Sequence, residues 1–230
     1  MRRPLVTLTG VAVAAFGLTS SAPAAPAEAA FPGPLVRPVA ADVKRARSVP
    51  LRAADVFAEF TRTTASGPLP TVAHCNGYPG DRSDITVTGE GRSAFAFGSH
   101  SIGSSVLWFE SVADAKRYWA RTVRLQYIEC RAKGLRLKNG AGAIVEPAIS
   151  QAAAIALRPT GADAAAAYRV IGGVPGTPGA GNDSYNYLDT NVFVRVGRSI
   201  ALLRTVWITS ACDCYHRLAR VLATRLRAAR

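Results

Sequence analysis

The pattern that most constrains the fold lies near the end of the chain, where two short segments alternate between kinds of residue. Valine recurs at every second position of residues 192–196, and a second alternating segment runs over residues 200–208 after the pair Gly197-Arg198. Such alternation predicts strands with two different faces. A two-residue connection with glycine first favours a tight hairpin turn. We therefore expect an antiparallel hairpin in which Val196 pairs with Ser199.

This register separates a core face from a second, half-polar face of the hairpin. Arg195 and Arg204 fall on the second face together with Phe193 and Leu202. Such a face meets solvent or lines a groove. Arg195 and Arg204 are therefore our candidate ligand-binding residues.

The rest of the chain contributes further strands and helices. Strands are expected at residues 93–97, 104–109, 144–149, 154–158 and 166–171. Helices are expected at residues 51–63, 112–130 and 214–228, the second of them opened by a capping-box-like S-V-A-D sequence. Strands that cluster between helices, without regular alternation, predict an α+β domain. We expect an antiparallel or mixed sheet of about six to seven strands, with helices packed on one face and stapled by disulfides.

The first thirty residues have the organisation of a secretory signal peptide. Arg2 and Arg3 precede an apolar run over residues 5–18, and an alanine- and proline-rich segment ends at Ala30. The run is too short for a permanent membrane helix, so we expect residues 1–30 to be removed on export. No cysteine follows the run until Cys75, which leaves no candidate for a lipid-attached anchor. The mature chain is expected to be secreted, extracellular and monomeric, without a membrane anchor.

The remaining chain divides into two regions. Residues 31–50 contain four prolines and the basic cluster Lys44-Arg45-Arg47 without sustained periodicity, which predicts a flexible arm. Residues 51–230 are long enough for one domain of ordinary size with its own core. We expect a single sensor-like α+β domain there.

The chain is strongly basic, with 28 lysines and arginines against 15 acidic residues. Its richness in Ala, Gly and Arg is the usage expected of a GC-rich genome such as an actinobacterium's. Codon bias therefore explains the charge better than nucleic-acid binding, and we expect no specific nucleic-acid partner. A basic exported protein is still expected to bind anionic envelope polymers in a salt-dependent, unspecific manner.

Four cysteines in an exported chain predict disulfides, with three possible pairings. We favour Cys75 with Cys130, because this bond would join a glycine- and proline-rich loop to the buried end of a long helix. On the loop-entropy model, a cross-link closing about 56 residues destabilises the unfolded chain by roughly 4 kcal/mol. Cys212 and Cys214 would then pair with each other or stay reduced. The crossed pairings of Cys75 and Cys130 with these two remain open.

Two other uses of the sulfurs are open. Residues two apart have Cα atoms about 5.5 to 7 Å apart, near the strained end for a disulfide, so a redox role of the C-D-C sequence is an alternative. Zinc binding by His74-Cys75 and C-D-C-Y-H has the right ligand types but no standard spacing. We expect no metal and no cofactor.

Motifs of the common enzyme classes are missing from the sequence. It contains no G-x-S-x-G, no phosphate loop, no dinucleotide-binding fingerprint and no HExxH. The carboxylates Glu110 and Asp114 fit the start of a helix, and Glu129 fits its outer face, better than they fit a pair for sugar chemistry. We expect no catalytic residues.

One stretch of the chain resembles a known family. It consists of a strand, a capped helix and a later cysteine: Val106-Leu107-Trp108-Phe109-Glu110-Ser111-Val112-Ala113-Asp114-Ala115, then Trp119 and Cys130. This order is similar to that of the PknH-like extracellular sensor domain family of actinobacteria. The later strand at residues 191–194, its partner and the terminal helix fit the same order, so the resemblance covers about residues 51–228. The C-D-C sequence departs from the family pattern, and the chain has no kinase.

The resemblance implies an exported, disulfide-bearing α+β domain with a cleft, which senses a ligand or partner outside the cell. Our leading hypothesis is a secreted, non-catalytic binding domain. Its cleft, near Arg195 and Arg204, would accept an anionic small molecule or envelope component. The alternative is a secreted envelope hydrolase or a thiol-disulfide protein that uses the C-D-C pair. A purely structural or interaction protein of the cell wall is a third reading.

Overall fold

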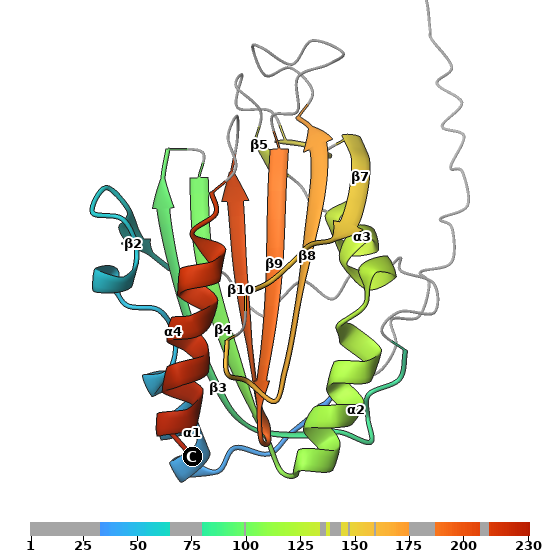
Figure 1. Ribbon diagram of the computed structural model, residues 1–230. Helices are drawn as coiled ribbons and strands as arrows, with labels where there is room; N and C mark the ends of the chain where they lie inside the picture. The colour runs from blue at the N-terminus through green and yellow to red at the C-terminus, as the bar shows by residue number, and fades with distance from the viewer. Residues whose placement is uncertain are drawn as a thin grey trace, which may run out of the picture.

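The computed structural model describes residues 33–64, 80–98, 100–133, 137–138, 144–146, 148–158, 160–174, 187–207 and 212–230. Figure 1 shows a twisted sheet with α4 and α1 on the left of the view and α2 and α3 on the right. The helices are α1 (Ala40–Ser48), α2 (Val112–Thr122), α3 (Leu125–Lys133) and α4 (Tyr215–Ala228), with a 3-10 turn η1 (Ala53–Asp55). The strands are β1 (Leu35–Val36), β2 (Thr61–Thr63), β3 (Thr86–Phe97), β4 (His100–Phe109), β5 (Leu137–Lys138), β6 (Ile144–Val145), β7 (Ala148–Ala154), β8 (Ala164–Gly173), β9 (Tyr187–Val196) and β10 (Ser199–Trp207).

The described strands form one mixed sheet of eight and one separate pair. The order in the large sheet is β1-β3-β4-β10-β9-β8-β7, with β2 pairing β3 at the edge, and β5 pairs β6. Only the β1–β3 pairing is parallel among these. The predicted α+β class with a mixed sheet is therefore confirmed. Two short edge strands, β1 and β2, bring the sheet to eight strands.

The C-terminal hairpin has the predicted register. Ser199 pairs with Val196, and Gly197 begins the turn with a φ of 58°. This left-handed conformation favours glycine, which has no Cβ to clash with the backbone. The predicted hairpin of residues 93–97 and 104–109 is also present, within the longer strands β3 and β4.

The helices pack on both faces of the sheet, so the expectation of helices on one face is wrong. In β10, Ala201 and Leu203 pack with α4, whereas Leu202 packs with α3 on the opposite face. Likewise Val194 of β9 lies on the α4 side and Phe193 on the α3 side. Consecutive apolar residues in these central strands make both faces hydrophobic, and each face needs its own cover.

The expected flexible arm is wrong for the described residues from 33 onwards, because it contains β1 and α1. Helix α1 lies on the α4 side, where Ala46 and Val49 are fully buried. Its backbone lies directly against two glycines of β3, since a Cβ on Gly89 or Gly91 would collide with the carbonyl groups of Asp42 or Ala46. The small glycines explain how α1 approaches the sheet so closely.

A buried ion pair also holds α1 in place. The Asp42 carboxylate accepts two hydrogen bonds of 2.7 Å from Arg198 and one of 2.6 Å from the Thr88 hydroxyl. Burial alone would raise the pKa of Asp42, but these hydrogen bonds and the Arg198 charge hold it below its usual range. The basic cluster that suggested an arm therefore lies on a helix whose acidic residue is anchored in the core.

Two predicted elements differ from the structure. No helix spans residues 51–63; Asp55 instead closes the turn η1 and accepts bonds of 2.7 and 2.8 Å from Arg225 of α4. The predicted helix 112–130 is divided at Val123, which has non-helical angles of φ −92° and ψ 69°. The Thr122 hydroxyl donates a hydrogen bond to the carbonyl of Tyr118, and the Tyr168 hydroxyl donates one to the carbonyl of Val123. This division creates α3 as a separate helix.

Other expectations are met in part. The predicted start of α2 is confirmed, since the Ser111 hydroxyl accepts a 3.0 Å bond from the amide of Asp114. Cys130, expected to be buried, is half-buried in α3. The predicted strand at residues 154–158 is wrong, because β7 ends at Ala154.

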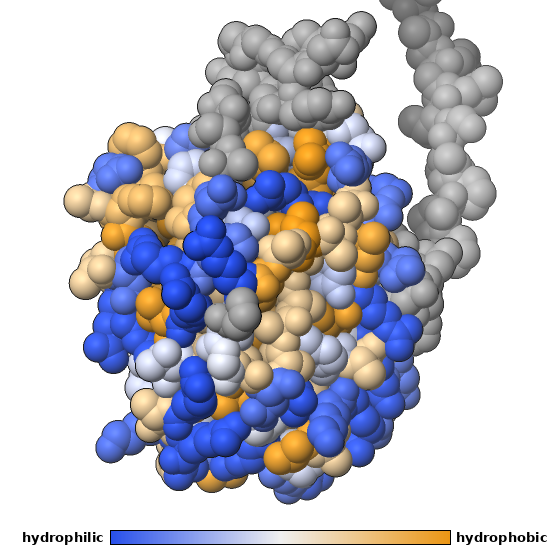
Figure 2. Space-filling view, viewed as in Figure 1, coloured by the Kyte–Doolittle hydropathy of each residue, from blue (hydrophilic) through white to orange (hydrophobic). Residues whose placement is uncertain are grey.

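The outer surface of α4 is polar and basic. Figure 2 shows hydrophilic side chains along this helix and over the lower margin of the molecule, with hydrophobic patches between them. Arg217, Arg220 and Arg227 are exposed on α4. Within the described residues, no helix is long and apolar enough to cross a membrane.

Candidate functional site

A groove opens on the α2–α3 side of the sheet, where these helices leave β3 and β4 uncovered. The residues of β3 and β4 that face this side are small and half-buried: Ala94, Ser101, Gly103 and Ser105. They help to line a cavity of about 1140 Å³, which continues past the edge of the sheet at β1 and β2, where Val43, Arg47 and Arg62 also line it. Clefts of about 300–1,000 Å³ are usual for small-molecule sites, so the space is ample for such a ligand. We call it the arginine groove after residues in its lining: Arg82, Arg92, Tyr118, Tyr127, Arg131, Leu202 and Arg204.

Arg131 is the most unusual residue of the groove. It lies in α3 and is only 4% exposed, yet its Nε and Nη1 find no hydrogen-bond partner among the described residues. Its guanidinium lies over the Tyr127 ring, 5.7 Å from the ring centre. Burial and the nearby charge of Arg204 lower the pKa of Arg131, but a guanidinium stays protonated in proteins. A buried positive charge therefore faces the cavity without a partner among these residues.

Arg82 is a second buried arginine of the same kind. It is 7% exposed, its Nε has no partner in the described part of the chain, and it lies 5.9 Å from the centre of the Tyr118 ring. Burial raises the pKa of Tyr118 to about 12, against the influence of the positive charges of both Arg82 and Arg131. The charges of both arginines therefore influence the same side chain, Tyr118.

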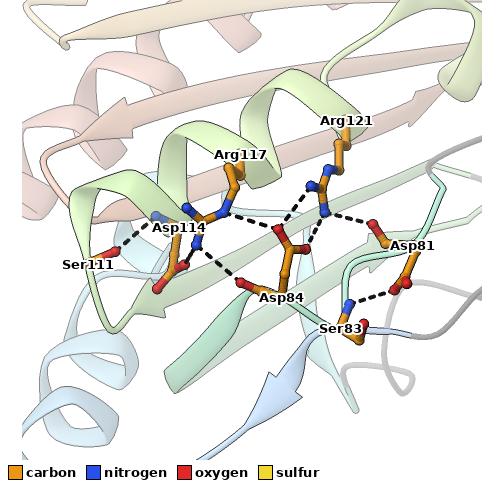
Figure 3. A network of polar contacts seen from close by, with 7 residues as sticks. All are labelled: Asp81, Ser83, Asp84, Ser111, Asp114, Arg117 and Arg121. Atoms are coloured by element: carbon orange, nitrogen blue, oxygen red, sulfur yellow. Dashed lines mark hydrogen bonds and ion pairs between the residues drawn. The ribbon is translucent and has the colours of Figure 1, made fainter.

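A network of surface ion pairs fixes the segment that carries Arg82 (Figure 3). Arg121 of α2 binds both carboxylate oxygens of Asp84 and donates a 2.7 Å bond to the carbonyl of Asp81. Arg117 of α2 donates a 3.1 Å bond to the carbonyl of Asp84 and also pairs with Asp114. Helix α2 thus holds the residues on both sides of Arg82, which aims the buried side chain at the groove.

Arg204 lies on the floor of the groove and is satisfied within the protein. Its guanidinium binds Asp189 of β9 through Nε at 3.0 and 3.1 Å and through Nη2 at 2.8 Å. Asp189 also accepts bonds from the Tyr187 hydroxyl and the Asn191 amide. Burial would lower the pKa of Arg204, but the Asp189 charge raises it above its ordinary value. This closed network gives the groove a rigid floor.

The groove as a whole carries an excess of positive charge. Glu90, the acidic residue among the described residues of its lining, already binds Arg92, and Arg204 on its floor binds Asp189 of β9. Arg82 and Arg131 make no ion pair with the described residues. A bound anion would supply the missing partner.

The structure separates the two arginines that the sequence singled out. Strand register places Arg195 and Arg204 on the α2–α3 side, as expected from their alternation. Arg204 lines the groove, but Arg195 does not, and its Nη1 lies 3.5 Å from the carbonyl of Gly197 in its own hairpin turn. A ligand-binding role for Arg204 stays a prediction, and its ion pair with Asp189 gives it a structural role as well.

Sequence reasoning missed Arg131 and Arg82, the two residues that now define the site. Arg131 lies directly after the helix expected at residues 112–130, because the sequence does not show the division at Val123 that extends α3 to Lys133. A signal was present: Tyr127 and Arg131 are four residues apart and lie on one face of a helix. Arg82 sits in a segment without periodicity, and no pattern in the sequence distinguishes it from exposed arginines.

The cysteines of the C-D-C sequence pair with each other. Cys212 and Cys214 form a disulfide with a Cα–Cα distance of 5.2 Å. In this bond the two sulfurs are joined to each other and are not thiolates. The described residues contain no group of three or more metal-binding side chains placed for a metal ion. Cys130 is also disulfide-bonded. Cys75 and His74 lie outside the described residues, so the pairing of Cys75 with Cys130 stays a prediction.

A comparison with solved structures finds a structural likeness for this chain. No protein-family model matches this chain, and no curated protein matches it either. Among solved structures, the chain is similar to the extracellular domain of PknH from Mycobacterium tuberculosis, at a TM-score of 0.49 and 10% sequence identity. The match covers 84% of this chain and 98% of that one. A likeness of this size is weak and carries no conclusion about activity.

Proposed function

We propose that this protein is a secreted, non-catalytic, sensor-like binding domain, and that its arginine groove takes an anionic small molecule or envelope component. One observation carries the proposal: the charged side chain of Arg131 is buried at the edge of a large cavity without a partner in the described residues. An unpaired buried charge is unfavourable, and hydrogen bonds to a charged group are among the stronger ones. Anion binding would therefore stabilise the folded protein.

The rest of the groove supports a binding role. The floor is rigid because Arg204 and Asp189 are fully engaged with each other, and α2 fixes the segment around Arg82. A site that is already formed loses little conformational freedom when a ligand enters. The positive charge of the whole chain would also attract anions from solution, an effect that weakens as salt is added.

Thermal unfolding at low ionic strength tests the proposal. The probes are citrate, inorganic phosphate and an anionic wall polymer, with glycerol as a neutral control. A ligand present at 100 times its dissociation constant stabilises the folded state by about 2.7 kcal/mol. For a domain of this size that raises the melting temperature by about 5 to 10 °C.

Variants assign the effect to the groove. Arg131→Gln should lose most of the shift, since it removes the positive charge and keeps a polar side chain. Arg220→Gln is the matched control, because Arg220 is exposed on α4 on the other side of the sheet. No shift with any anion, or an equal loss in both variants, would contradict the proposal.

A further inference from the structure

The charge balance of the groove indicates what kind of anion fits it. Six arginines line the cavity. Arg47 and Arg62 are exposed to solvent, and Arg92 and Arg204 are neutralised by Glu90 and Asp189. The other two, Arg82 and Arg131, are both more than nine-tenths buried and have buried nitrogens without partners in the described residues. Two buried positive charges thus remain to be balanced, whereas water can solvate the charges of the two exposed arginines.

The two charges cannot be relieved by the neighbouring side chains. Each guanidinium lies over a tyrosine ring, Arg82 over Tyr118 and Arg131 over Tyr127. A ring face attracts a cation but accepts no full charge. The Tyr118 hydroxyl stays neutral at ordinary pH, because burial raises its pKa to about 12. The balancing charge must come from outside these residues.

The donors are also arranged for a group with several acceptor oxygens. Arg131 offers Nε and Nη1, and Arg82 offers Nε, so three buried nitrogens from two separate segments of the chain lack acceptors among the described residues. A guanidinium pairs well with oxygens held in a plane or a tetrahedron, in a two-point geometry. A carboxylate has two oxygens and one charge, whereas a phosphate monoester has three terminal oxygens and a charge of about −1.5 to −2 at pH 7.

From this balance we propose that the arginine groove is selective for a phosphate monoester, bound between Arg82 and Arg131. This inference rests on the proposed anion-binding function and names its ligand class. The phosphate oxygens accept hydrogen bonds from both arginines. The rest of the ligand lies over the small residues of β3 and β4, in the remaining space of the cavity.

Two probes of similar shape but different charge show whether the charge of the ligand or its shape determines binding. Phenyl phosphate and phenyl sulfate both present a tetrahedral group, but the sulfate carries one negative charge. Calorimetric titration of the full mature chain at pH 7.5 should give at least about tenfold tighter binding of phenyl phosphate, because its additional negative charge strengthens the charge-assisted hydrogen bonds to both arginines. In Arg82→Gln and Arg131→Gln the preference should shrink, because one cation is left.

Arg220→Gln and Arg195→Gln are matched controls, since both remove a positive charge outside the groove and should keep the preference. Far-ultraviolet circular dichroism of each variant checks that it is folded. Vesicles containing phosphatidic acid distinguish a lipid headgroup from a soluble ester. If the protein sediments with the vesicles and phenyl phosphate releases it, the ligand is a lipid headgroup. Binding of phenyl phosphate without sedimentation assigns a soluble ester.

The outcomes separate this inference from the proposed function. Equal affinities for the two probes, both reduced in the groove variants, would overturn the selectivity and leave anion binding supported. Absence of binding by phosphate, sulfate and carboxylate probes to the wild type would overturn both. A phosphate preference that survives in Arg82→Gln and Arg131→Gln would place the phosphate site elsewhere and overturn the inference.

Discussion

Single residues in this protein carry opposite electrostatic roles, and Arg131 and Arg204 show the contrast. Both lie on the α2–α3 side of the sheet, but only Arg204 has a carboxylate partner among the described residues. Replacing Arg131 with leucine removes an uncompensated buried charge. Arg131→Leu should therefore increase the free energy of unfolding of the ligand-free protein, by about 1 to 3 kcal/mol, while anion binding is lost. Urea unfolding with and without phosphate measures both effects.

Arg204→Leu is the comparison for this prediction. It leaves Asp189 buried without its cation, so it should lower the free energy of unfolding by about 3 kcal/mol or more. A purely structural role of Arg131 predicts a loss for both variants. If Arg131→Leu lowers the free energy of unfolding as much as Arg204→Leu does, the proposed anion-binding role of Arg131 is contradicted.

Asp42 makes stability depend on pH. Its pKa is lowered in the folded protein, after burial is offset by the hydrogen bonds and charge of Arg198, so it binds protons less readily there than in the unfolded chain. Its contribution is therefore present above the unfolded value near 3.8 and is lost as pH falls through the folded value. The wild type should lose more stability than Asp42→Asn between pH 5 and about pH 2. Parallel curves in acid urea titrations would show that Asp42 contributes nothing.

At the scale of elements, the closest approach in the fold is that of α1 to β3. Gly91→Ala would place a Cβ against the backbone of Ala46, which belongs to a helix and cannot give way as a side chain does. We expect a loss of about 1 to 3 kcal/mol or more in the free energy of unfolding. Gly103→Ala is the matched control on β4, because its Cβ would meet only the carbonyl of Ser93, at 3.8 Å. Equal effects of the two substitutions on chemical denaturation would disprove the close packing.

Elements with a strict local pattern could be predicted from the sequence, and elements defined by distant contacts could not. The hairpin β9–β10 and helix α4 follow from alternation and helical periodicity alone. Helix α1 could not be recognised, because Ala46 is its one buried apolar residue and its position depends on Gly91 and on Arg198, far away in sequence. The same reason explains the site: Arg131 and Arg82 come together only through the division of the helix at Val123 and the anchoring of the segment around Asp84.

That anchoring gives a prediction at the same scale. Asp84 lies on the surface and binds Arg121 and Arg117, so its contribution to global stability is expected to be small. Its effect on the groove should be larger, because it holds the segment that places Arg82. Asp84→Asn should weaken phosphate binding several-fold and change the melting temperature little. Calorimetry with phenyl phosphate checks the first effect and thermal unfolding the second; unchanged affinity would show that Arg82 needs no such anchor.

At the scale of the whole molecule, the disulfides expected of an exported protein hold parts of the folded domain in place. Cys212–Cys214 closes a short loop before α4, whereas the bond of Cys130 fastens α3, the helix that carries Arg131. If the partner of Cys130 is Cys75, reduction would loosen the wall of the groove as well as the global fold.

Digestion with trypsin without reductant tests this pairing on protein collected from the medium. Cleavage after arginine gives peptides 63–82, 125–131 and 205–217, which hold Cys75, Cys130 and both cysteines of the C-D-C sequence. We expect the first two peptides to be joined and the third to be lighter by two hydrogens than its reduced form. Cys130→Ser should lower the free energy of unfolding by about 2 to 5 kcal/mol, as for other native disulfides, and weaken phosphate binding. Crossed disulfide pairs, or phosphate binding that is unaffected by full reduction, would show that a Cys75–Cys130 bond does not shape the groove. Side-chain packing alone would then hold its shape.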